Sequence, residues 1–450
     1  MIREHLLTTI RSALAEGETG KLREVLEEAR VQEILEIFDE LPGEERYILF
    51  TLLSKDKAAQ TLSELSPELQ AEYLKTLPPW RVQEILEELS LDDLADALQA
   101  VEEEDPELAR RLKAYLDPKT RAEVEALTRY EEDEAGGLMT PEYVAVRASM
   151  TVDEVLRFLR RAAPDAETIY YLYVVNDEGR LIGVLSLRDL IVADPKTRVK
   201  EIMNPDVVHV RTDTDQEEVA RLMADYDFTV LPVVDEEGRL AGIVTIDDVV
   251  DVLEEEATED IHKLAAVDVP DLVYSEAGPF ELWLARLRWL VILILTGMVT
   301  SSILQGFASV LEAATALAFY LPVLLGTGGN TGNQSATLII RALATRDLEA
   351  KDWKAILFKE SLVGSLLGGS LALLLGGKVA LDGHAALLPV VGLALFLLVL
   401  FANLVGAMFP LILRRFGVDP ALVSNPLIAT LSDVLGLLIY LFVARLILHL

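Results

Sequence analysis

The stretch SNPLIATLSDVLGLLIY, from Ser424 to Tyr440, decides the fold of the C-terminal part of this 450-residue chain. It belongs to an apolar run, Ala421 to Leu448, that exceeds the roughly 20 residues needed to cross a hydrocarbon core. Asp433 lies well inside this run and is the only acidic residue after Asp419. A charged side chain there costs about 2.5–3.5 kcal/mol on insertion scales. The stretch therefore predicts a membrane helix with a functional carboxylate, the alternative being an Asp that caps or hydrogen-bonds a neighbouring helix.

Other apolar stretches of sufficient length precede it: Trp289 to Leu311, Ala313 to Ile340, Ala355 to Leu375 and Ala385 to Leu413. Together the stretches predict five membrane spans. No Lys, Arg or His lies deep in any of them to pair with Asp433. A mobile cation is therefore the obvious countercharge.

A second polar interruption, GTGGNTGNQS at Gly326 to Ser335, falls within the second stretch. Backbone loosened by so much Gly cannot face lipid and must be buried or line a watery path. The alternative is close helix packing through small residues, as at Gly364 and Gly368. Packing requires Gly rather than Asn and Gln, so the segment favours a role in the path.

Positive charges orient the spans. They flank one set of span ends, at Arg286, Arg288, Arg341, Arg346, Lys351, Lys354, Lys359, Arg414 and Arg415. The opposite loops carry little positive charge, with Lys378 as the exception. By the positive-inside rule we expect a multi-pass protein of the cell (inner) membrane, with its N-terminus in the cytoplasm and its C-terminus outside. The first residues lack the apolar core and cleavage site of a signal peptide.

The charge is distributed unevenly. The chain has 40 Lys and Arg against 74 Asp and Glu, a net charge of −34, and a mean hydropathy of +0.32. From Asp271 onward there are 11 residues of each sign, so the whole net charge lies in residues 1–270. Such an acidic surface repels phosphate backbones, and we expect no nucleic-acid partner. With no Cys and five scattered His, we expect neither a thiolate metal site nor an enzyme's catalytic residues.

The acidic half begins with a helical repeat. Leucines recur every 12 residues, mostly followed by Pro or Ser, which mark helix starts: Leu41, Leu53, Leu65, Leu77 and Leu89. Short helices stacked in this way form a superhelical scaffold, and a plain irregular bundle is the alternative. The pattern predicts an all-α N-terminal domain at residues 1–130.

A duplicated strand–turn–strand–helix unit follows. YYLYVVNDEGRLIGVLSLRD at 170–189 recurs as TVLPVVDEEGRLAGIVTIDD at 229–248, and Met139-Thr-Pro recurs as Met203-Asn-Pro. This resembles a tandem pair of CBS modules, an α/β domain at residues 131–250 with modules at 131–200 and 201–250. The resemblance implies a regulatory sensor that can hold ATP or another adenine nucleotide, or an empty structural pair. The residues that match the nucleotide-binding pattern are Ser186, Arg188, Asp189, Thr245 and Asp248.

The second module runs into an acidic linking helix, predicted at residues 247–270. Asp248, Asp251, Glu255 and Glu259 share one face of it. A solvated charged face is the usual explanation of such a run. The position of this helix, between the sensor and the membrane, favours a cation site instead, and oxygen ligands suit Mg²⁺ or Ca²⁺.

Together these parts resemble the MgtE family of magnesium channels. The sharpest signatures are Glu134 to Pro141 (EAGGLMTP), Gly328 to Ser335 (GGNTGNQS) and the helix from Asn425-Pro to Asp433. The resemblance implies a homodimer with one pore between protomers, built mainly from the second and fifth spans. It also implies that Asp433 holds a hydrated Mg²⁺ near Asn333, Asn425 and Ala429.

The expected protein is thus a multi-domain membrane protein, with residues 271–450 forming a five-helix pore domain. The resemblance implies Mg²⁺ uptake through a Mg²⁺-selective channel that closes when cytoplasmic Mg²⁺ bridges the acidic elements. The sensing residues we predict are Asp92, Asp96, Asp227, Asp248, Asp251, Glu217, Glu256, Glu259 and Asp419. Alternatives are a secondary divalent-cation transporter coupled to H⁺ or Na⁺, a CBS-controlled membrane hydrolase, and a pure nucleotide sensor.

Overall fold

A computed structural model describes residues 2–162, 166–267, 277–345, 347–420 and 425–449. The chain divides into two compact units, Met1–Glu254 and Glu255–Leu450, and each is described by itself. Some predicted features lie outside the described residues: Arg346, residues 268–270 of the linking segment and residues 421–424 of the fifth apolar stretch.

Short helices make up the first half of unit 1: α1 (Ile2–Glu16), α2 (Thr19–Glu28), α3 (Val31–Asp39), α4 (Gly43–Leu52), α5 (Lys55–Ser63), α6 (Pro67–Thr76), α7 (Pro79–Leu86), α8 (Leu91–Glu104), α9 (Pro106–Lys113) and α10 (Pro118–Leu127). The residue after each repeating leucine caps the next helix, at Pro42, Ser54, Ser66, Pro78 and Ser90. Leu41, Leu53 and Leu77 are buried. The helical repeat read from the leucine spacing is confirmed.

The second half of unit 1 contains two small sheets of the same design. After α11 (Ala135–Leu138), the first module has β1 (Ala145–Arg147), α12 (Val152–Ala162), β2 (Tyr171–Val175), β3 (Leu181–Ser186) and α13 (Leu187–Val192). After α14 (Val199–Ile202), the second has β4 (Val210–Arg211), α15 (Gln216–Tyr226), β5 (Val230–Val234), β6 (Leu240–Thr245) and α16 (Ile246–Ala265). In each sheet the first strand pairs parallel with the second, which pairs antiparallel with the third. The duplicated α/β pair is confirmed.

The repeated Met residues explain how the two modules join. Each entry segment reaches the other module's sheet: Thr140 bridges to Ile243, and Asn204 bridges to Val184. A Cβ at Gly242 would lie 2.7 Å from the Met139 side chain. A Cβ at Gly183 would likewise lie 2.7 Å from Met203. The two glycines thus leave room for the two methionines.

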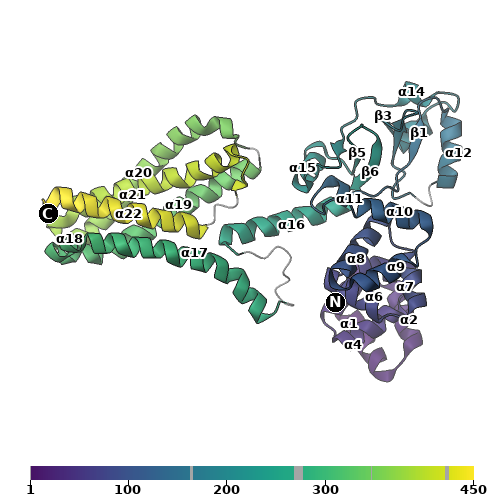
Figure 1. Ribbon diagram of the computed structural model, residues 1–450, viewed down its shortest axis with the longest axis horizontal. Helices are drawn as coiled ribbons and strands as arrows, with labels where there is room; N and C mark the ends of the chain where they lie inside the picture. Colours follow the sequence, from purple (N-terminus) through teal and green to yellow (C-terminus); the bar gives the residue numbers. More distant parts are fainter. Residues whose placement is uncertain (1, 163–165, 268–276, 346, 421–424, 450) are drawn as a thin grey trace. The chain divides into compact units, whose positions relative to one another are not determined.

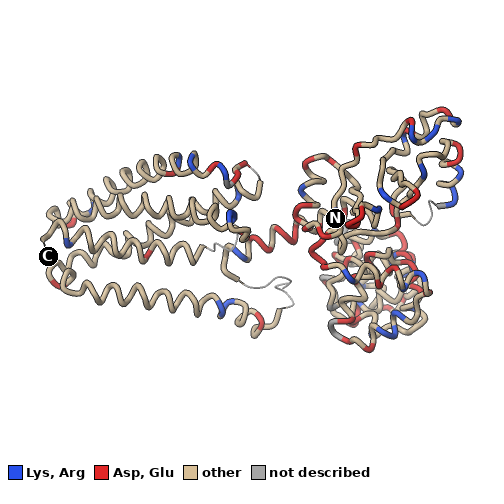
Figure 2. The backbone as a smooth tube through the Cα atoms, turned by 45° about the horizontal axis from the view of Figure 1, so that its top comes forward, with Lys and Arg blue, Asp and Glu red and all other residues tan. Residues whose placement is uncertain are grey.

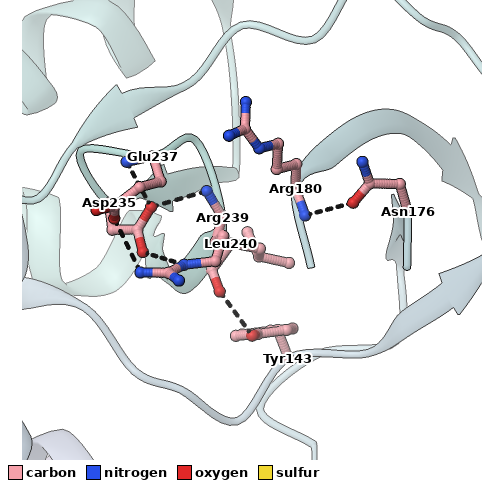
Figure 3. Close-up of polar contacts among 7 residues, drawn as sticks. All are labelled: Tyr143, Asn176, Arg180, Asp235, Glu237, Arg239 and Leu240. Atoms are coloured by element: carbon pink, nitrogen blue, oxygen red, sulfur yellow. Dashed lines mark hydrogen bonds and ion pairs between the residues drawn. The ribbon is translucent and has the colours of Figure 1, made fainter. Parts of the chain in front are cut away.

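Polar contacts around the hairpin turns tie the modules together further (Figure 3). The Tyr143 hydroxyl donates to the Leu240 carbonyl at 3.0 Å, and Leu240 N–H donates to the Gly179 carbonyl of the first module's turn at 3.1 Å. Within the second turn, Arg239 pairs with Asp235 at 2.7 Å and with Glu237 at 2.8 Å. These contacts therefore join the two modules through their hairpin turns.

Unit 2 consists of long helices that lie side by side (Figure 1). They are α17 (Pro279–Gly306), the short α18 (Ala308–Ala313) and η2 (Thr315–Phe319), α19 (Leu321–Ala344), η3 (Ala350–Asp352), α20 (Trp353–Leu381), η4 (Ala385–Leu387), α21 (Leu388–Arg415) and α22 (Asn425–Leu448). Figure 2 shows long stretches of these helices without Lys, Arg, Asp or Glu.

Four of these helical segments are long and apolar enough to cross a membrane: Pro279–Gly306, Trp353–Leu381, Ala385–Arg415 and Asn425–Leu448. The second predicted span differs from expectation. It was predicted from Ala313, but α18 ends at that residue, the next residues form the separate η2, and the Gly- and Asn-rich segment lowers the hydropathy of α19. The second predicted span, and with it the total of five spans, therefore stays a prediction that rests on the 24-residue length of α19.

Candidate functional site

The membrane carboxylate lies on α22. Asp433 is half-buried, and it makes no hydrogen bond or ion pair with any residue that the structure describes. Asn425, Ala429 and Asp433 stand at i, i+4 and i+8, which places them on one face of the helix. The carboxylate therefore shares its helix face with Asn425, as the sequence led us to expect.

Helix α19 packs closely against this helix. A Cβ at Gly329 would lie 3.4 Å from the Ala429 Cβ, and one at Gly332 would lie 3.0 Å from the Ser432 hydroxyl. Side-chain oxygens buried near this contact lack hydrogen-bond partners among the described residues: Asn333 Oδ1, Asn425 Oδ1 and Ser432 Oγ. Two packed helices thus offer one carboxylate and several neutral oxygens, the donor chemistry that suits a hydrated Mg²⁺.

Unit 1 holds a second group of acidic residues, which we call the carboxylate cluster. Its members come from α8, from the loops beside the first sheet and from the start of α16: Asp92, Asp93, Asp96, Glu142, Glu167, Asp247 and Asp248. Asp92 is close enough to influence most of the others, and its Oδ1 is buried without a hydrogen-bond partner among the described residues. A cation is the natural partner of so much negative charge.

Burial and mutual repulsion raise the pKa values in the carboxylate cluster. Burial, followed by the charge of Asp92, raises the pKa of Glu142 to about 7. Burial also raises the pKa of Asp248 to about 7, although Thr245 donates a 2.6 Å hydrogen bond to it. The pKa of Asp93 is raised to about 6 by burial. Burial and Asp92 raise the pKa of Asp96 as well, but this side chain stays open to water, which screens its charge more.

The arrangement does not form a direct coordination shell. Over the described ranges, no group of three or more His, Cys, Asp or Glu has the geometry of a metal site. Mg²⁺ keeps several of its waters when it binds proteins, so a loose set of carboxylates can hold it through water. The orphaned Asp92 oxygen and the raised pKa values fit that mode of binding.

The predicted sensing residues are distributed unequally. Asp92, Asp96 and Asp248 lie in the carboxylate cluster, whereas Glu217, Asp227 and Asp251 lie outside it and are exposed. Sequence reasoning did not predict Asp93, Glu142, Glu167 or Asp247 as sensing residues. The signal for Asp93 was adjacency to Asp92, and Glu142 directly follows the Met-Thr-Pro motif.

The remaining predicted residues belong to unit 2. Lys263, near the end of α16, forms ion pairs of 2.8 Å with both Glu259 and Asp419. Asp260 has a raised pKa because of burial and the nearby Asp419 charge, and Glu256 adds to the repulsion. Next to Lys263, Leu264 packs against a buried cluster from α19 and α22, namely Ala336, Ile340 and Ile428. The end of α16 therefore contacts both helices that carry the membrane oxygens.

The predicted nucleotide residues separate into two places. Ser186 and Arg188 line a hollow of about 610 Å³ together with Tyr170, Tyr171, Leu187, Ile191, Val192 and Thr229. Asp189 accepts a 2.6 Å hydrogen bond from Ser186 and so orients its hydroxyl. Thr245 and Asp248 form the equivalent pair in the second module, but there Asp248 belongs to the carboxylate cluster. The hollow has the size of a small-molecule site.

Family profiles match most of the chain. A profile described as divalent cation transporter matches residues 321–443, the MgtE intracellular N domain matches residues 29–133, and the CBS domain matches residues 135–196 and 199–255.

Individual proteins match over longer ranges. The chain is 81% identical over 360 residues to "Magnesium transporter MgtE" of Thermus thermophilus, covering 80% of each chain. It is 40% identical over 323 residues to the protein of the same name from Enterococcus faecalis, covering 72% of this chain and 71% of the other.

Two solved structures resemble unit 1. One is the cytosolic domain of the Mg²⁺ channel MgtE in complex with ATP, with 77% identity and a TM-score of 0.54, covering 55% of this chain and 99% of that one. The other is the soluble part of a magnesium transporter, with 34% identity and a TM-score of 0.51, covering 57% of this chain and 99% of that one.

Proposed function

Because the chain belongs to the MgtE family of divalent cation transporters, we propose that it is a Mg²⁺-selective channel for Mg²⁺ uptake across the cytoplasmic membrane. One observation carries the proposal: Asp433 sits on an apolar helix without a partner among the described residues, beside orphaned Asn333 and Asn425 oxygens. A carboxylate in that setting requires compensation, and a passing divalent cation supplies it.

The pore forms between two protomers of a homodimer. Two-fold symmetry would bring two Asp433 side chains to one axis, giving a −2 site for a +2 ion. Ligation through water by few oxygens matches the reluctance of Mg²⁺ to dehydrate. The membrane potential drives entry: two positive charges gain about 4.6 kcal/mol per 100 mV, at about 2.3 kcal/mol per charge.

Cytoplasmic Mg²⁺ closes the channel by binding the acidic elements. Without Mg²⁺ the members of the carboxylate cluster repel one another, and this repulsion adds to burial in raising the pKa values of Asp93, Glu142 and Asp248. To change the ratio of closed to open channels from 1:99 to 99:1, Mg²⁺ must bind the closed form more favourably by about 5.5 kcal/mol in total. A site filled at ten times its Kd contributes about 1.4 kcal/mol, so about four sites that exist only in the closed form suffice.

The end of α16 is the element that would transmit closure. Its Lys263 and Leu264 contact Asp419 and the α19–α22 cluster, close in sequence to the Asn425 end of the ion path. A change in how this helix is held therefore acts directly on the two helices with the membrane oxygens.

Nucleotide binding is a further part of the proposal. The hollow at Ser186 and Arg188 offers a hydroxyl and a guanidinium for ribose and phosphate, with Tyr170 and Tyr171 available for stacking. A similar cytosolic domain is described in complex with ATP. ATP or another adenine nucleotide would modulate the channel through this module.

Purified protein in liposomes tests the proposal. Asp433→Ala should reduce Mg²⁺ influx to background, because the carboxylate is lost, while the protein still elutes as a folded species. Thr430→Ala is the matched control, because its hydroxyl only donates to Pro426 within the same helix. Normal influx through Asp433→Ala would refute the pore assignment.

Electrical recording distinguishes a channel from a secondary transporter coupled to H⁺ or Na⁺, in which Asp433 could also bind the cation. A channel gives discrete single-channel currents without any counter-ion gradient. Transport that ceases when the H⁺ and Na⁺ gradients are collapsed would favour the secondary transporter instead.

A further inference from the structure

A second carboxylate lies inside a predicted span. Glu360 is in α20, seven residues after Trp353, which places it about 10 Å into the helix at 1.5 Å per residue. It is partly buried and forms no ion pair within the part of the chain that the structure describes. A membrane carboxylate without a countercharge requires some other stabilisation.

Hydrogen bonds from two neighbouring helices provide it. Asn403 of α21 donates from Nδ2 to Glu360 Oε2 at 2.7 Å and to the Glu360 carbonyl at 2.9 Å. Ser335 of α19 donates to the same Oε2 at 3.3 Å. Asn403 and Ser335 are both 3% exposed. One carboxylate oxygen therefore joins three helices at a buried point.

The joined point lies on the back of the proposed ion path. Successive helical residues turn by about 100°, so Ser335 and Asn333 point in nearly opposite directions from α19. Asn333 lines a hollow of about 430 Å³ with Gln334, Thr337 and Leu338. The hydrogen bond of Ser335 holds one face of α19 in place. It therefore also fixes the position of the opposite face, which carries the Asn333 side chain.

The helix backbones around Glu360 are closely packed. Beside Glu360, a Cβ at Gly364 would lie 3.3 Å from the Asn403 Cβ. On α19, three residues before Ser335, Gly332 touches Gly406 of α21. Because the helices are packed so closely here, a small displacement of Glu360 also displaces the face of α19 that carries Asn333.

We propose that Glu360 is a positioning residue: by accepting hydrogen bonds from Ser335 and Asn403, it fixes α19 so that Asn333 is presented to the ion. This inference rests on the proposed function, because it takes α19 as a wall of the ion path. The carboxylate acts as an acceptor and does not itself meet the ion.

Paired substitutions in the full-length protein test it by Mg²⁺ and Ca²⁺ flux into liposomes. Glu360→Gln keeps an acceptor oxygen and should retain at least half of the Mg²⁺ flux. Glu360→Leu removes the acceptor and should lower Mg²⁺ flux about tenfold or more, the usual scale for a lost hydrogen bond to a charged group. Ser335→Ala removes one donor and should give an intermediate loss. Both damaging variants should change the Mg²⁺ to Ca²⁺ flux ratio, which general loosening of the fold would leave unchanged.

Ser361→Ala is the control, because that hydroxyl donates only to Leu357 of its own helix. If Glu360→Leu does not fold, Ser335→Ala carries the test. Equal loss in Glu360→Gln and Glu360→Leu would overturn the inference, since the charge itself would then matter. Normal flux in the damaging variants, or lost flux with an unchanged ion ratio, would overturn it too. Unchanged flux in Asp433→Ala would instead refute the proposed function.

Discussion

The two units use carboxylates in opposite ways. In unit 1, acidic residues crowd together, and burial, together with repulsion from Asp92, raises the pKa values of Glu142 and Asp248 to about 7. In unit 2, Asp433 stands alone on an apolar helix. A crowded set can take up several cations, because each bound cation relieves part of the repulsion. A solitary carboxylate can hold one cation at a time, and this suits conduction.

The surroundings differ as well. The carboxylate cluster draws its members from helices and loops, and their side chains range from half-buried to exposed. The membrane site is enclosed by helices whose backbones touch, at Gly332 with Gly406 and at Gly368 with Phe396. We therefore expect substitutions in the closely packed unit 2 to lower its stability strongly. Substitutions in the acidic unit 1 should instead have graded effects on the response to Mg²⁺.

Gly406→Ala should have the largest effect on stability. Its Cβ would collide with the Gly332 carbonyl oxygen, and backbone cannot move aside as a side chain can. Overpacking typically costs about 1–3 kcal/mol, and we expect the upper end here. The midpoint of heat-induced loss of the folded species measures it. Gly369→Ala is the control, because a Cβ there meets nothing within 4 Å. Equal midpoints for the two variants would contradict the close packing.

Asp92→Asn combined with Asp96→Asn should have the next largest effect. Removing two charges from the carboxylate cluster should weaken closure, and the loss of one filled site corresponds to about 1.4 kcal/mol, so the ratio of open to closed channels at a given Mg²⁺ concentration should rise about tenfold. The measurement is Mg²⁺ inhibition from the cytoplasmic side. Glu125→Gln, an exposed acid on α10, serves as the control. If the double variant is inhibited as the wild type is, the carboxylate cluster is not the sensor.

Much of the fold could be predicted because its signals are local. The 12-residue leucine spacing placed the helix starts, since the following Pro or Ser caps each helix. The duplicated hairpins predicted two matching sheets, and the apolar runs predicted the long helices of unit 2. The break between α18 and α19 was missed, because no Pro or Gly marks it within residues 313–320.

The sites were predicted less completely, because they depend on distant contacts. Asp92, Asp96 and Asp248 were predicted as sensing residues, and this stays a prediction; Glu142 joins them only when α8 meets the loop after the Met-Thr-Pro motif. Glu360 carried the same signal as Asp433, an acid inside an apolar stretch, and was overlooked beside Lys359. Its hydrogen bonds with Ser335 and Asn403 span 25 and 43 residues, beyond the reach of any local pattern.

The smallest expected effect is a dependence of the stability of unit 1 on pH. The pKa values of Asp93, Glu142 and Asp248 are raised in the folded unit, so their neutral forms favour folding. That stabilisation is complete below the ordinary carboxyl pKa of about 4 and is lost as the pH rises through about 6 to 7. With EDTA present, protease should therefore cut the connection between α10 and α11 faster at pH 8 than at pH 5.5. We expect about a threefold difference, because water screens the partly open carboxylates. Rates are normalised to an unstructured peptide at each pH. Mg²⁺ should remove the difference between the two pH values, because it replaces protons as the counterion of the carboxylates. Faster cutting at pH 5.5 would instead mean that repulsion in the carboxylate cluster does not control the stability of unit 1.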